Sequence, residues 1–139
     1  MFCKKLFSTA FFYAVAALAG GVFAREFTRF HRFEGNTVLF TLHVHLFMMG
    51  MLFFLVAGLL EKQFQLSAHP LMRPFCLCYH IGLLLTVAML AIRGTGEVMG
   101  LSLSRQAAAA LSGISGLGHI FLSAGLVLFF LILRKRTAR

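Results

Sequence analysis

The sequence is poor in acidic residues: it has four, against thirteen lysines and arginines. None of the four lies inside a long apolar run; they are Glu26, Glu34, Glu61 and Glu97. Four-helix bundles that hold two iron ions need inward-facing glutamates on their helices. The scarcity of acid therefore excludes that class of metal protein.

Cysteine is scarce as well, with Cys3 near the start of the chain and Cys76 and Cys78 at the head of an apolar run. Residues two apart on a helix point to different faces, so the last two are badly placed for one zinc ion or a local disulfide. We interpret all three as ordinary thiols in an apolar setting.

Apolar residues, in contrast, make up 60% of the 139 residues, and the mean hydropathy is +0.89. A soluble domain of this length cannot bury so much apolar surface. The composition predicts an integral membrane protein with one domain, residues 1–139, whose first partner is the lipid bilayer. We interpret the net charge of +9 as lysines and arginines anchored at lipid headgroups, not as nucleic-acid binding.

Four apolar runs are long enough to span a membrane, at about residues 6–24, 37–60, 74–92 and 107–133. They predict an all-α bundle of four membrane helices, joined by loops at about 25–36, 63–73 and 93–106. The first run also fits a cleavable signal peptide, and we interpret it as a retained helix.

The distribution of basic residues favours both termini on the cytoplasmic side of a bacterial inner membrane. With that orientation, the inside carries Lys4, Lys5, Lys62, Arg73, Arg134, Lys135, Arg136 and Arg139, and the outside carries Arg25, Arg29, Arg32, Arg93 and Arg105.

Four histidines lie within the predicted spans: His43, His45, His80 and His119. An imidazole in hydrocarbon costs free energy unless something binds or pairs it. Four of them on three helices suggest a cofactor. His43 and His45 point about 200° apart, so they cannot both bind one iron in the same pocket. His119 shares a helical stripe with small residues, and His80 has only Tyr79 as a polar neighbour in the sequence.

Imidazole without carboxylate or paired thiolate suits either b-type haem or copper. Haem would place its propionates near four arginines on the outer side, Arg25, Arg29, Arg93 and Arg105. Copper could also use Met48, Met49 and Met51, although methionine is an ordinary apolar residue in a span.

The stretch His43-Val-His-Leu-Phe-Met-Met-Gly resembles the tenth helix of haem-copper oxidase subunit I. The resemblance implies that the two histidines hold haem on opposite sides of the helix. It also implies a homotrimer, in which neighbouring chains clasp haem between His43 and His45.

The whole chain is also similar to a family of small four-span bacterial membrane proteins of unknown function. The pieces that carry this similarity are Arg25-Glu-Phe-Thr, the histidine pair, Arg93-Gly94 and Gly116-Leu-Gly-His119.

The sequence thus predicts an oligomeric membrane protein that binds b-type haem through histidines. Electron transfer, with a redox partner yet to be identified, or binding of a small gas would be its task, and no catalytic residue is predicted. Two alternatives stay open: a copper-handling protein, and a non-catalytic assembly partner of a respiratory complex.

Overall fold

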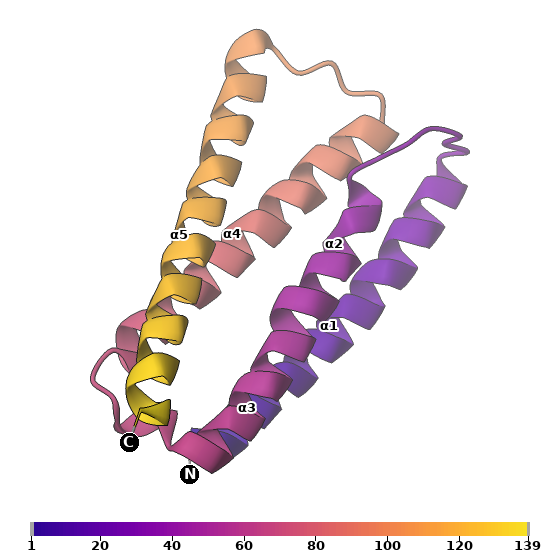
Figure 1. The fold of residues 1–139 in the computed structure, drawn as a ribbon. Coiled ribbons are helices and arrows are strands. Elements are labelled where there is room, and N and C mark those ends of the chain that lie inside the picture. Colours follow the sequence, from indigo (N-terminus) through magenta and orange to yellow (C-terminus); the bar gives the residue numbers. More distant parts are fainter. Residues whose placement is uncertain (1, 139) are drawn as a thin grey trace.

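The structure, a computed structural model, describes residues 2–138 and is built from helices (Figure 1). Helix α1 spans Phe2–Phe30. The second membrane helix is composite: α2 (Leu39–His45), a π-helical segment η1 (Leu46–Leu52) and α3 (Phe53–Phe64) follow one another without a break. A 3₁₀ turn, η2 (Leu66–Ala68), leads to α4 (Met72–Val98), and α5 (Arg105–Thr137) completes the fold. The all-α prediction is confirmed, with four helices long and apolar enough to cross a membrane.

The helices extend beyond the predicted spans at nearly every end. Arg25 and Arg29 belong to α1, and Arg93 and Gly94 belong to α4, where the sequence had suggested loops. Hydropathy marks only the part of a helix that lies in hydrocarbon. Backbone hydrogen bonds continue the helix into the headgroup region, where charged side chains are tolerated.

Glycines allow α4 and α5 to pack closely. A Cβ atom at Gly82 would collide with the backbone nitrogen of Leu122, and one at Gly118 would lie 2.7 Å from the Thr86 hydroxyl. Without a hydrophobic driving force between helices in lipid, such close backbone approach supplies much of the association energy. The two helices therefore pack tightly around the Gly82–Gly118 region.

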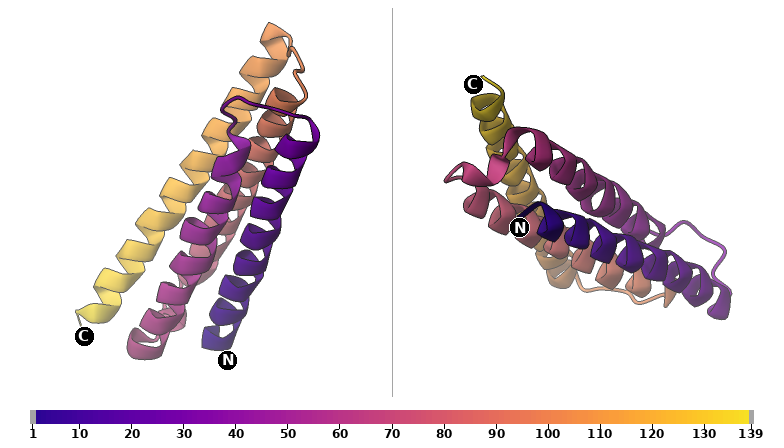
Figure 2. Two further views of the ribbon diagram at one scale, coloured as in Figure 1. Left: turned by 90° about the vertical axis from the view of Figure 1, so that its right-hand side faces the viewer. Right: turned by 90° about the horizontal axis from the view of Figure 1, so that it is seen from below.

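Above this contact, α4 and α5 separate toward the loop that joins them, as Figure 1 shows. Toward the chain termini the space between α3 and α5 is filled by aromatic rings, because Phe53 stacks on Tyr79 at 4.3 Å and meets Phe129 at 5.1 Å. Both termini lie at this aromatic end of the molecule (Figure 2). The bundle thus closes at one end and opens at the other.

Candidate functional site

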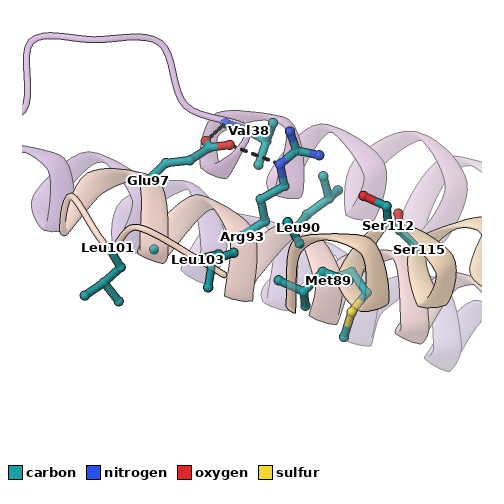
Figure 3. A pocket seen from close by; sticks show the side chains of 12 residues that line it. Val38, Met89, Leu90, Arg93, Glu97, Leu101, Leu103, Ser112 and Ser115 are labelled. Atoms are coloured by element: carbon teal, nitrogen blue, oxygen red, sulfur yellow. Dashed lines mark hydrogen bonds and ion pairs between the residues drawn. The ribbon is translucent and has the colours of Figure 1, made fainter. Parts of the chain in front are cut away.

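A cavity of about 390 Å³ occupies the open end, between the start of α2, the end of α4 and the start of α5. Its lining includes Val38 from α2's cap, Arg93 and Glu97 from α4, and Ser112 and Ser115 from α5 (Figure 3). The volume falls within the range of roughly 300–1,000 Å³ typical of cofactor pockets. We call the region between α2 and α5, with α4 as its floor, the cleft.

Glu97 of α4 links the start of α2 to α4. Its carboxylate accepts hydrogen bonds from the backbone N–H of Val38 at 2.9 Å and from the Thr37 hydroxyl at 3.0 Å. It also accepts one from Nε of Arg93 at 3.2 Å. The start of α2, whose N-cap residue Val38 makes no side-chain cap bond, is therefore held by a carboxylate from α4 together with the Thr37 hydroxyl, which accepts from Leu39 N–H.

Arg93 keeps spare capacity for a ligand. Only its Nε is engaged by Glu97, and within residues 2–138 no hydrogen bond or ion pair involves its two terminal nitrogens. Figure 3 shows the guanidinium group at the cavity with Nε turned to Glu97. A guanidinium with two free nitrogens can pair with a carboxylate of a bound molecule.

His45 lies on the same side of α2 as the cavity. It follows Val38 by seven residues, or about two turns, so the two side chains share a face. Its Nδ1 lies 2.9 Å from the carbonyl oxygen of Thr41. A carbonyl can only accept, so Nδ1 carries the proton and Nε2 keeps its lone pair.

His119 repeats this arrangement on α5. It follows Ser112 by seven residues and Ser115 by four, which places it on the face that lines the cavity. Its ring is exposed, and its Nδ1 donates to the Ser115 carbonyl at 2.9 Å. A histidine whose Nδ1–H is held by a carbonyl presents Nε2 in the form that binds metals.

The two histidines lie at similar heights along the floor of the cleft. Helix α2 meets α4 where Leu39 touches Gly94, and α5 meets α4 where Gly118 touches Thr86. Both helices run antiparallel to α4. His45 follows Leu39 by six residues and so lies opposite about position 88 of α4, and His119 follows Gly118 by one and so lies opposite about position 85. The two positions are about three residues, or ~5 Å, apart along α4. Their heights along α4 therefore differ by about one helical turn or less, with one ring on α2 and the other on α5.

His43 lies on a different face of α2, as its spacing from His45 predicted. Its ring packs against α1, with Cγ 3.6 Å from the position that a Cβ atom would take at Gly21. Its Nδ1 is the one buried side-chain nitrogen or oxygen without a hydrogen-bond partner in the part of the chain that the structure describes. His43 thus points away from the cleft.

His80 has a partner that the sequence did not reveal. The Tyr13 hydroxyl of α1 lies 2.7 Å from its Nδ1, across a separation of 67 residues. The imidazole also stacks on Phe54, with centroids 4.8 Å apart and planes 8° from parallel. The structure thus gives His80 a helix-to-helix bond on the α1 side, outside the cleft.

The four arginines considered as propionate partners are not equivalent. Of them, Arg93 alone lines the cavity, and Arg105 begins α5 beside it as an exposed residue. Arg25 and Arg29 are exposed near the end of α1, where Arg25 lies 3.8 Å from Glu26.

Across residues 2–138 no three or more His, Cys, Asp or Glu side chains come together in a group that could hold a metal ion. A bare copper ion would need several protein donors at one point. Haem brings four nitrogens of its own and asks the protein for one or two.

Comparison with known proteins gives one match. A family model described as a protein of unknown function (DUF2871) matches residues 3–136. No curated protein and no solved structure matches the chain, and the comparisons do not show the oxidase resemblance.

Proposed function

Because the chain belongs to the DUF2871 family, whose function is unknown, we propose a function from the cleft itself: binding of b-type haem through His45 and His119. The protein is then an electron carrier of the membrane. A bacterial inner membrane is its expected location, with both termini in the cytoplasm.

One observation carries the proposal. Both rings donate Nδ1–H to a carbonyl one turn back, which leaves both Nε2 lone pairs free, and helical spacing puts both histidines on the helix faces that carry Val38 and Ser112 of the cavity lining. Neither residue gains a partner on another helix from this arrangement, so helix packing does not explain why an imidazole is kept there. An iron between the two nitrogens would offset the cost of the polar rings.

The residues around the cleft would contact different parts of the cofactor. Ser112 and Ser115 are small and leave room on the α5 wall, and Met89 and Leu90 offer apolar contacts from the floor. Arg93 would neutralise a propionate through its terminal nitrogens. Glu97 positions Arg93 and the start of α2, and so acts on the cofactor only through them.

Haem bound in this way supplies one-electron chemistry. With imidazole on both sides the iron has no open position, which favours electron transfer over gas binding. Both donors come from one chain, so the cofactor site needs no second copy. The homotrimer implied by the oxidase resemblance, in which neighbouring chains would share haem between His43 and His45, is a separate proposal, and the packing of His43 against α1 of its own chain does not favour it.

The test is an absorption spectrum of the purified protein in both redox states, with a haem determination. We expect a Soret band, split red-region bands on reduction, and about one haem per chain. Replacing His45 or His119 with Ala removes one axial donor and should abolish the low-spin spectrum.

The matched control is His31→Ala, since His31 lies beyond α1 and outside the cleft. It should keep the full spectrum. A colourless wild-type protein, or a spectrum that survives both cleft variants, would contradict the proposal. A colourless protein that retains copper would favour the copper-handling alternative.

A further inference from the structure

A second cavity, of about 370 Å³, lies on the opposite side of the bundle, between α1 and α4. It is lined by Ser8, Thr9, Phe12, Tyr13, His80 and Leu84. All of these residues belong to helices long and apolar enough to cross the membrane. Four of the six side chains carry a polar group, which is an unusual concentration at this depth.

The Tyr13–His80 hydrogen bond sets the polarity of this site. A phenol, with a pKa near 10 in water, is a far better donor than a neutral imidazole N–H, and the imine nitrogen is the better acceptor. Tyr13 therefore donates to Nδ1 at 2.7 Å, and the ring proton of His80 is on Nε2. This is the reverse of His45 and His119, so His80 offers a donor where they offer a lone pair.

The donor on Nε2 is free. No hydrogen bond within residues 2–138 engages it, and it is not among the buried polar atoms that lack a partner, so it is accessible on a residue that lines the cavity. An unpaired N–H within the membrane costs free energy, and a lipid-soluble molecule with a hydrogen-bond acceptor could satisfy it.

Two hydroxyls in the cavity are also uncommitted. Threonine hydroxyls within these helices bond back to their own helix, as those of Thr28, Thr86 and Thr95 do. No such bond is found for Ser8 or Thr9 in the described part of the chain. The cavity thus holds several hydrogen-bonding groups without an internal partner, beside the apolar side chains of Phe12 and Leu84.

We infer that this cavity binds the head group of a lipid-soluble 1,4-quinone. Such a ring is flat and apolar on both faces, carries two carbonyl acceptors, and enters from the bilayer with its isoprenoid tail in lipid. The His80 N–H and a hydroxyl of α1 meet the carbonyls. A redox role for this site rests on the proposed function, because the quinone would exchange electrons with the haem. Quinone binding itself does not require haem.

The experiment uses the purified full-length protein in phosphatidylcholine nanodiscs. Ubiquinone-1 and menadione compete with a photoreactive azidoquinone, and the labelled peptides are identified by mass spectrometry. We expect saturable labelling on α1 and α4 near Thr9 and His80. Thr9→Val, which keeps the shape of the side chain, and Tyr13→Phe, which keeps the ring, should each weaken binding about tenfold.

Thr95→Val is the control, because the Thr95 hydroxyl bonds to its own helix outside the cavity. Absent saturable labelling, labelling elsewhere, or affinities of the two cavity variants equal to that of the control would overturn the inference. Haem content is read from the same samples. Labelling at this cavity without haem would contradict the haem proposal alone, and haem without labelling would contradict the quinone site alone.

Discussion

At the scale of single residues, the glycines of α4 and α5 show how closely these two helices approach each other. A methyl group at Gly82 would meet backbone atoms of α5, which cannot swing aside as a flexible side chain could. Overpacking of this kind costs about 1–3 kcal/mol. We expect Gly82→Ala to lower the free energy of unfolding by that amount, measured as a lower melting temperature in detergent with a thiol-reactive dye.

Gly113→Ala is the matched control. A Cβ atom there has no neighbour within 4 Å, and Gly113 is exposed on α5. Alanine is the better helix former by about 0.5–1 kcal/mol, so this variant should melt at the same temperature or slightly higher. An equal loss in both variants would show that α4 and α5 do not pack through Gly82.

Single residues also show which features of the site could be predicted from the sequence. The four membrane histidines stand out because imidazole is costly in lipid, and the opposite directions of His43 and His45 follow from helical geometry. What each ring bonds to did not follow. Tyr13 and His80 are 67 residues apart, and only the folded arrangement, which brings this part of α1 beside α4, shows that they meet.

At the scale of the elements, the π-helical segment η1 is the feature that periodicity missed. Counting 100° per residue through residues 37–60 assumes one regular α-helix, but Leu46–Leu52 is wider. Such bulges gather at functional sites, and η1 begins directly after His45. Within it, the carbonyl of Met49 accepts a hydrogen bond from the Tyr79 hydroxyl of α4 at 2.9 Å.

Tyr79→Phe tests this role of η1. The ring stays and keeps its stacking on Phe53, while the Met49 carbonyl loses its donor. We expect a loss of about 0.5–1.5 kcal/mol in the free energy of unfolding, the net contribution of a typical intramolecular hydrogen bond. The haem band, if present, should shift or broaden, since the segment that follows His45 is disturbed. A variant as stable as the wild type would show that η1 needs no support from α4.

The ends of the helices were the least predictable part of the elements. Hydropathy located four apolar segments because lipid requires them, and residues 2–138 do contain four helices long and apolar enough to cross a membrane. It gave no sign that Arg93 and Glu97 continue α4, nor that Glu97 caps the start of α2. A cap supplied by another helix is a tertiary contact, and a pattern within one segment cannot reveal it.

At the scale of the whole molecule, both termini share one end of the bundle, as four spans require (Figure 2). This end carries the larger number of basic residues, and the opposite end carries Arg25, Arg29, Arg32, Arg93 and Arg105. The positive-inside rule predicts that the end richer in lysine and arginine lies in the cytoplasm. The cleft opens toward the other end, so the proposed haem would lie nearer the outer surface.

This orientation is testable with reporter fusions at the C-terminus. Green fluorescent protein, which matures in the cytoplasm, should be bright there, and alkaline phosphatase, which needs export, should be inactive. The charge bias is modest, with eight basic residues at one end against five at the other over the whole sequence. Removing two of the eight should therefore weaken the preference for one orientation. Lys4→Gln with Lys5→Gln leaves six against five, and we expect a mixture in which both reporters show activity. Active phosphatase on the unaltered chain would reverse the orientation and put the cleft on the cytoplasmic side.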